Sequence, residues 1–180
     1  MYEFERPPHL VFDGPSSIQS ARIRQLHDYW RSKCRNDRLP PRNAIEPGDI
    51  RPLLPHLILA ELTPEPFRIL YRLVGTAIAK AHKEDFTGRD HAEVESLRGA
   101  GIEDAYRNTL KSGQPMFGRT GLYAGDHSWI GFEYAILPLS DDGVLVNKCL
   151  AIECTGAAEQ QAWAEGAAGR PAPEEPRQGR

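Results

Sequence analysis

Four side chains close together in the sequence have the residue types that bind metals. His82, Asp85, Asp90 and His91 combine imidazole and carboxylate groups, and both kinds of group bind Zn²⁺ and other divalent ions. Their spacing matches no established metal motif. Helix ends and a solvated loop, with Asp90 as an N-cap, explain the same residues. We therefore expect no metal site here.

A second cluster, Asp126-His127-Ser128, contains the residue types of a hydrolytic triad. Such a triad is assembled in space, and adjacent residues rarely reach that geometry, so a polar hairpin loop is the expected structure. The sequence contains no GxSxG, P-loop or GxGxxG motif. We expect no catalysis. The enzyme alternative is a small α+β cone, of the isomerase or cyclase type, that uses a lone acid or base in an apolar pocket.

The composition is that of one ordinary globular domain. The 180 residues are 40% hydrophobic and 26% charged, and the formal net charge is -3. No overall basic field would attract nucleic acid or anionic lipid, and no apolar run is long enough to cross a membrane. Cys34, Cys149 and Cys154 have no paired spacing, which indicates free thiols in a reducing compartment. We expect a cytoplasmic protein that binds neither nucleic acid nor membrane.

The two ends of the chain differ from its middle. Ile23, Leu26 and Trp30 recur at helical spacing and predict an amphipathic helix at 18–35, with Ser16 or Ser17 as its N-cap. This helix either packs on its own domain or forms a dimer contact, and residues 1–44 form an N-terminal extension. Residues 156–180 are mostly Ala, Gly, Pro, Glu, Gln and Arg, which predicts a disordered tail.

The middle of the chain predicts an α+β domain at 45–155. Alternating apolar residues and turn signals predict strands at 56–62, 67–74, 116–123, 128–139 and 144–154. Helical patterns and stop signals predict short helices at 76–82, 92–97 and 102–111. The Asp142-Gly143 pair is the best hairpin signal in the chain.

Four motifs in this region resemble one known family. FRILYRLVGTAI at 67–78 and DFTGR at 85–89 are similar to the FxYRLVGTxI…DxTGR pattern of a PAS-like family of small alphaproteobacterial proteins. LLPHL at 53–57 and ILPLSDDG at 136–143 resemble its flanking motifs. The resemblance implies a PAS-like five-stranded antiparallel sheet with short helices on one face. It also implies a role in sensing or in signalling contacts, with no particular ligand named.

The resemblance allows two cofactors to be weighed. A flavin photosensor of this fold needs a cysteine in the helical region, but Cys34 precedes the domain and the other cysteines lie on the last strand. A PAS haem sensor usually takes its axial histidine from the long helix before the last three strands, and 102–111 contains none. Haem and flavin are both disfavoured, although His82 or His91 could ligate haem from another direction. The cofactor, if there is one, is unknown.

A ligand pocket is expected between the inward sheet face and the short helices. Its candidate lining residues are Tyr71, Leu73, Ile78, His82, Phe86, Tyr106, Trp129, Phe132 and Tyr134, with Arg72 and Glu133 as polar anchors. Phe132 and Tyr134 lie on the opposite strand face from Trp129 and Glu133, so only one of these sets points inward. The alternative is a filled aromatic core with Arg72 in an outer salt bridge.

These observations predict a stand-alone PAS-type sensory or adaptor domain. It would bind a small molecule, a signalling partner protein, or both, without catalysis. Because no kinase, cyclase or DNA-binding motif is present, the signal is expected to leave through protein contact. We expect a homodimer formed through the 18–35 helix and an exposed sheet face. The enzyme named above and a structural adaptor with a filled core are the alternatives.

Overall fold

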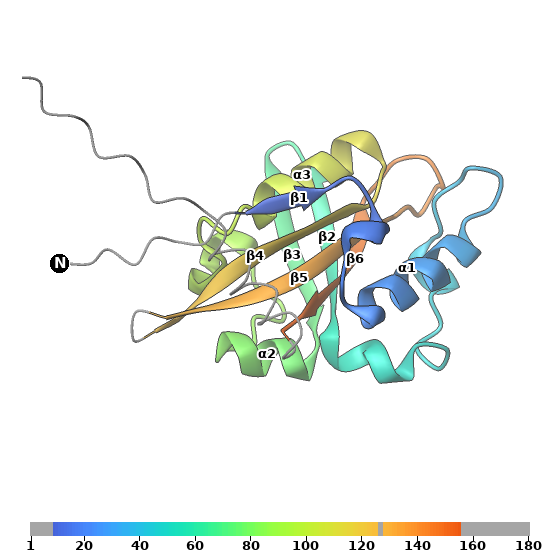
Figure 1. Ribbon diagram of the computed structural model, residues 1–180. Helices are drawn as coiled ribbons and strands as arrows, with labels where there is room; N and C mark the ends of the chain where they lie inside the picture. The colour runs from blue at the N-terminus through green and yellow to red at the C-terminus, as the bar shows by residue number, and fades with distance from the viewer. Residues whose placement is uncertain (1–8, 126–127, 156–180) are drawn as a thin grey trace, which may run out of the picture.

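The computed structural model describes residues 9–125 and 128–155, and its centre is one antiparallel sheet (Figure 1). The six strands lie in the order β1-β4-β5-β6-β2-β3. They are β1 (Leu10–Phe12), β2 (Leu57–Pro64), β3 (Phe67–Val74), β4 (Met116–Gly125), β5 (Ser128–Leu139) and β6 (Lys148–Cys154). The α-helices are α1 (Ala21–Lys33), α2 (Thr76–His82) and α3 (Ile102–Ser112). The expected α+β architecture is confirmed, with β1 as one strand more than predicted.

Both faces of the sheet are covered, and the residues of β5 alternate between two cores. Phe132, Tyr134 and Ile136 belong to the cluster that faces α2 and α3. Leu137 and Leu139 belong to the cluster that faces α1. We call these two surfaces the inner face and the outer face. The short 3-10 turns at 91–93 and 95–97 replace the helix expected at 92–97.

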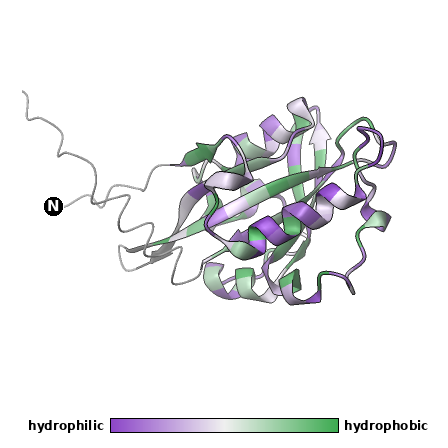
Figure 2. Cartoon of the chain, turned by 45° about the vertical axis from the view of Figure 1, so that its right-hand side comes forward, coloured by the Kyte–Doolittle hydropathy of each residue, from purple (hydrophilic) through white to green (hydrophobic). Residues whose placement is uncertain are grey.

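Helix α1 packs on the outer face through its apolar stripe. Ile23, Leu26 and Trp30 are almost fully buried there, and the indole nitrogen of Trp30 donates a hydrogen bond to the carbonyl of Pro138 at 2.8 Å. Figure 2 shows hydrophilic residues on the outward side of this helix. The stripe is therefore unavailable for the expected dimer contact, and the sheet face below it is not exposed.

The start of α1 is held by a buried carboxylate on β5. Glu133 is fully buried and accepts hydrogen bonds from the backbone amides of Gln19 at 3.0 Å and Ser20 at 2.8 Å. It also pairs with Arg119 at 3.3 Å. A negative charge at this end is favoured by the helix dipole. Glu133 thus replaces the serine N-cap expected at 16–17, because Ser20 is the N-cap residue and makes no side-chain cap.

A β-bulge changes the alternation of β3. Leu59 pairs with Leu73 but the next residue, Ala60, pairs with Tyr71, so Arg72 is the extra residue. Leu73 is consequently 47% exposed while Val74 is buried. The prediction that Leu73 shares the inner face with Tyr71 is wrong for this reason.

The last hairpin is wider than its Asp-Gly signal predicted. β6 begins at Lys148 and not at 144, because the carboxylate of Asp142 accepts hydrogen bonds from the amides of Val144 and Leu145, each at 2.8 Å. These amides lower the pKa of the Asp142 carboxyl. The turn leaves Val144 66% and Leu145 70% exposed.

Replacing Glu133 by glutamine tests the anchoring of α1. We expect Glu133→Gln to lower the free energy of unfolding by about 2–3 kcal/mol, because Arg119 loses its buried partner and two amides lose a charged acceptor. Urea denaturation followed by circular dichroism measures this. Glu103→Gln, which breaks the exposed pair with Arg107, is the matched control and should have little effect. Equal effects of the two substitutions would contradict the anchoring role.

Candidate functional site

Most of the predicted pocket residues meet on the inner face. The buried side chains that come together between the sheet and α2 and α3 are Tyr71, Ile78, His82, Phe86, Tyr106, Phe132 and Tyr134. We call these seven residues the inner cluster. Trp129 pairs with Tyr123 in the ladder between β5 and β4, but its side chain lies outside the described part of the structure.

Both predicted polar anchors lie outside the inner cluster. Glu133 is on the outer face, where it caps α1. Arg72 is the exposed bulge residue and forms an ion pair with Glu61 at 2.7 Å. The outer salt bridge of Arg72 is therefore the arrangement that the structure contains. The strand register decides which face of the sheet a side chain lies on. The charges of Glu133 and Arg72 therefore did not predict their positions.

The side chains of the inner cluster pack directly against one another. The ring of Tyr71 lies 4.9 Å from that of Phe86, centroid to centroid, in an edge-to-face contact. The ring of His82 makes a similar contact with Phe86 at 5.3 Å. These are favourable aromatic geometries, and Tyr71, Phe86 and Phe132 are fully buried. Within the described residues, the space expected for a ligand is occupied by the chain's own aromatic rings.

A tyrosine and a histidine close one side of this cluster. The hydroxyl of Tyr71 lies 2.7 Å from the Nδ1 of His91. Burial raises the pKa of Tyr71 well above its ordinary value, and burial lowers the pKa of His91. Tyr71 therefore donates the hydrogen bond, and the Nδ1 of the neutral His91 imidazole accepts it. This bond satisfies the buried hydroxyl proton of Tyr71.

An ion pair lies at the other side of the inner cluster. His82 has a fully buried side chain, and its Nε2 lies 2.9 Å from a carboxylate oxygen of Glu153 on β6. Its Nδ1 lies 2.8 Å from the hydroxyl of Ser96, and that hydroxyl donates to Glu84 at 3.2 Å. Both ring nitrogens of His82 therefore have a hydrogen-bond partner within the chain.

Three residues of this region were not predicted. Glu153 and Cys149 lie on β6 and point to the inner face, and Ser96 reaches His82 from a 3-10 turn. The signal for Cys149 and Glu153 is the alternation of Cys149, Ala151 and Glu153 along β6, which places a carboxylate among apolar neighbours. Burial raises the pKa of the Cys149 thiol, so this cysteine stays protonated.

The remaining predicted clusters do not gather around one point. His82 binds Glu153, His91 binds Tyr71, and Asp90 pairs with Arg68 and caps the turn that follows it. Over residues 9–125 and 128–155 the structure brings together no group of three histidine, cysteine or acidic side chains that could hold a metal ion. Asp126 and His127, together with the predicted tail at 156–180, lie outside the described residues.

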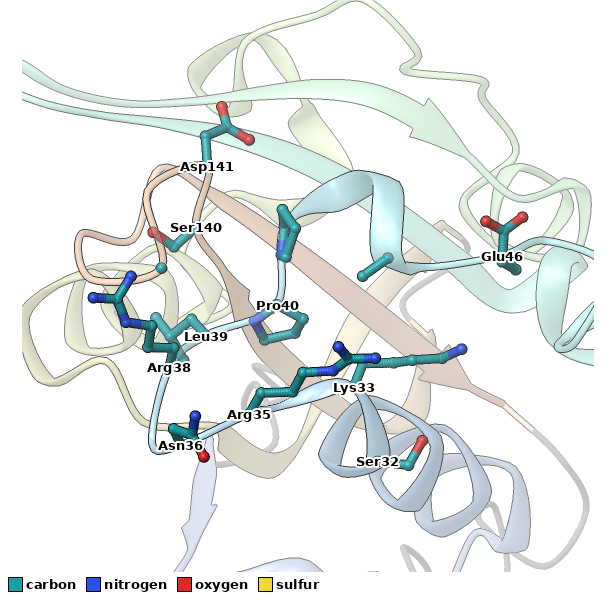
Figure 3. A pocket seen from close by; sticks show the side chains of 13 residues that line it. Ser32, Lys33, Arg35, Asn36, Arg38, Leu39, Pro40, Glu46, Ser140 and Asp141 are labelled. Atoms are coloured by element: carbon teal, nitrogen blue, oxygen red, sulfur yellow. The ribbon is translucent and has the colours of Figure 1, made fainter.

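Two open grooves lie away from the inner cluster, beyond the end of α1. One has a volume of about 560 Å³ and lies between Lys33, Arg35 and the Ser140 turn (Figure 3). The other has a volume of about 650 Å³ and extends toward Arg31 and Val144. Arg38 and Leu39 line both grooves. No residue of the predicted pocket lines either groove.

The fold is an antiparallel sheet with short helices packed over an inner core, and it indicates the class of protein. A family model described as a PAS domain matches residues 18–144, which is most of the 180-residue chain. The chain therefore belongs to the PAS-domain family. It is a sensory or adaptor domain of the kind that binds a small molecule or a partner protein. The matched region includes α1, which packs on the sheet.

Three solved structures similar to this chain are light-oxygen-voltage proteins. An RNA-binding light-oxygen-voltage receptor is 13% identical with a TM-score of 0.47; the match covers 89% of this chain and 42% of that chain. A light-oxygen-voltage domain studied with a flavin analogue is 15% identical with a TM-score of 0.47, over 67% of this chain and 92% of that chain. A Rhodobacter sphaeroides LOV protein is 16% identical with a TM-score of 0.46, over 63% and 68%. No curated protein matches the sequence.

No helix among the described residues is long and apolar enough to cross a bilayer.

A double-mutant cycle tests the ion pair of the inner cluster. We expect His82→Leu and Glu153→Leu each to lower the free energy of unfolding by about 3–5 kcal/mol, because each leaves the other side chain buried without its hydrogen-bonded partner. The double variant should lose clearly less than the sum of the two. Urea denaturation measures all three. The exposed pair of Arg72 and Glu61 is the control cycle and should show almost no coupling. Additive losses for His82 and Glu153 would contradict the ion pair.

The buried tyrosines predict a loss of stability at high pH. Burial raises the pKa of Tyr71, Tyr106 and Tyr134 in the folded chain, while the unfolded chain ionises near pH 10. Their stabilisation is present below about pH 10 and is lost as pH rises, because only the unfolded state then releases protons. Each tyrosine should contribute about 1.4 kcal/mol of loss per pH unit.

Urea denaturation at a series of alkaline pH values measures this slope. Tyr71→Phe should reduce the loss of unfolding free energy per pH unit by the contribution of one tyrosine. This holds whatever the substitution does to the stability at neutral pH. Leu73→Ala, which changes a neighbour of Tyr71 but removes no phenol, should keep the wild-type slope. An unchanged slope in Tyr71→Phe would mean that Tyr71 ionises in the folded protein.

Proposed function

We propose that this chain is a PAS-type adaptor that acts through contact with a partner protein, with its core filled by its own side chains. The observation that carries the proposal is the packing of the inner cluster. Its aromatic rings make direct contacts in the space between sheet and helices where a ligand was expected. A domain whose interior is filled by its own side chains can bind a partner only through its surface.

The same packing weighs against the enzyme alternative, and we propose that the domain does not catalyse a reaction. A lone general acid or base must reach a substrate. His82 of the inner cluster and the neighbouring Glu153 are buried against each other, and the phenol of Tyr71 is hydrogen-bonded to His91. None of these groups lines either of the two grooves beyond the end of α1.

A small-molecule sensor is the second candidate, because a polar pair, His82 and Glu153, lies at the inner cluster. A filled apolar core has no need for the buried His82–Glu153 pair, and such a pair could bind a polar group of a ligand that displaces the Phe86 ring. In that case the seven residues of the inner cluster would be its binding residues.

Several narrower predictions stay predictions. Free thiols at Cys34, Cys149 and Cys154 support a cytoplasmic location. A homodimer would need a surface other than the apolar stripe of α1, which is buried in its own chain. Membership of the narrower family of small alphaproteobacterial proteins rests on the sequence motifs alone.

Native mass spectrometry of freshly purified protein discriminates between the two candidates. We expect the mass of the unmodified chain, or a multiple of it, with nothing lost when the same sample is denatured. The physical reason is that the inner aromatic rings occupy the ligand space. A small molecule that is present under native conditions and released by denaturation would contradict the filled core and favour the sensor.

If a ligand is released, a matched pair of variants locates it. Phe86→Trp enlarges a ring of the inner cluster and should abolish retention at that site. Phe12→Trp enlarges a ring that packs on the outer face and should leave retention unchanged.

A further inference from the structure

We propose that the two grooves beyond the end of α1 form one docking site for an acidic protein segment that also carries aliphatic side chains. The site consists of Arg31, Arg35 and Arg38 together with the exposed pair Val144 and Leu145. We call these five residues the basic groove. The proposal rests on the proposed function, since it names the surface and the chemistry of the protein contact.

The basic groove is built on a tight hairpin. Arg35 and Arg38 pair across a two-residue turn, with a backbone hydrogen bond of 2.9 Å from the amide of Arg38 to the carbonyl of Arg35. Asn36 and Asp37 have φ values of 50° and 59°, which are those of a type I′ turn and uncommon for residues other than glycine. The turn thus holds two arginines at fixed positions.

The hairpin is attached to the rest of the fold on its other side. The amide of Leu39 donates to the carbonyl of Gly143 at 3.2 Å, and the amide of Ser140 donates to the carbonyl of Pro40 at 3.1 Å. In Figure 3 Arg38 lies on the side of Ser140, while Arg35 and Lys33 extend toward the side of Glu46. The groove walls are therefore held by backbone hydrogen bonds, and the arginine side chains remain exposed.

Among the residues that the structure describes, the three arginines have no acidic partner. Many cations of this protein are paired with acids, including Arg68, Arg89 and Arg107. Within the described residues, no carboxylate pairs with any of the arginines of the basic groove. The nearby Asp141 is occupied by Lys148 and Asn147, and the carboxylate of Asp142 holds backbone amides. Three guanidinium groups are consequently available for carboxylates of a partner.

An apolar pair lies beside this charge. Val144 lines the second groove, and Val144 and Leu145 are the two most exposed large apolar side chains described. Their backbone is fixed by Asp142. Ordered exposure of two aliphatic side chains next to unpaired arginines fits a segment that offers both carboxylates and aliphatic groups.

Nucleic acid fits this surface less well. A phosphate backbone would also meet the carboxylates of Asp37 and Glu46, which line the grooves, and the net charge of the chain is -3. The described lining residues of the two grooves include no exposed aromatic ring on which a base could stack. An acidic peptide can place its carboxylates against arginines alone.

Selection of random peptides displayed on phage tests the proposal with purified full-length protein. We expect enrichment of sequences that combine Asp or Glu with Leu, Ile or Val. Fluorescence anisotropy of an enriched, labelled peptide should show binding that weakens with added salt. The double substitution Arg35→Glu and Arg38→Glu should lower its affinity about tenfold or more, because like charges then face each other.

Arg22→Glu is the matched control, since Arg22 is exposed on α1 away from the grooves and undergoes the same change of charge. It should leave the affinity unchanged. Val144→Ser with Leu145→Ser is a second test that alters no charge, and it should weaken the same peptide. Circular dichroism must show that each variant is folded.

Three results would contradict the proposal that the basic groove binds an acidic protein segment. Enriched peptides that bind the double arginine variant as well as the wild type would place protein contact elsewhere and leave the proposed function intact. Tighter binding of labelled oligothymidylate with the same dependence on Arg35 and Arg38 would identify a nucleic-acid site. A wild-type dimer that dissociates in the double variant would make a second copy of this chain the occupant.

Failure to enrich any peptide would also contradict the proposed docking site. If native mass spectrometry in addition shows a retained small molecule, the proposed function fails as well. If it shows an empty chain, only the docking site fails.

Discussion

The burial of β5 on both faces is the constraint on which the rest of the structure depends. Its successive side chains point to opposite sides, so Phe132 and Tyr134 enter the inner core while Glu133 between them lies under α1. A charge at such a position must be satisfied by hydrogen bonds. The amides at 19 and 20 and Arg119 supply them, and this fixes where α1 begins. The sheet therefore determines the position of a helix that precedes it by more than one hundred residues in the chain, since Ser20 and Glu133 are 113 residues apart.

A buried carboxylate on the inner face is also hydrogen-bonded, but by a side chain and not by backbone amides. Glu153 is the carboxylate on that face, and its partner is a side chain, His82, held in place by Ser96. Ser96 in turn contacts Glu84, so a chain of polar groups crosses a region that is otherwise lined by aromatic rings. A pair of this kind gives little net stability, but removing one partner is costly. It thereby fixes the position of α2 against β6 and limits how the core can rearrange.

Local patterns predicted the elements, and long-range contacts decided which way their side chains point. The strands at 67–74 and 128–139 and the helix at 76–82 followed from alternation and turn signals, and they agree with β3, β5 and α2. Seven of the aromatic and apolar candidates also gather as expected. Leu73 and Arg72 did not, because a bulge arises from pairing with β2 and leaves no mark in β3 itself. Glu133 was misplaced because its partners lie in a distant segment, and β1 was missed because three residues carry too little pattern.

The same strand also supports the surface proposed for protein contact. Beyond Glu133, β5 continues to Pro138, whose carbonyl binds Trp30 near the end of α1, and the chain then reaches Ser140, which binds the carbonyl of Pro40. The hairpin that carries Arg35 and Arg38 is thus attached at both ends to one continuous stretch of backbone. Its position depends on the packing of α1 on the outer face, and that packing depends on side chains of β5 that alternate with the inner cluster. Because close-packed interiors transmit small displacements, the inner core and the basic groove share a mechanical support even though they share no residue.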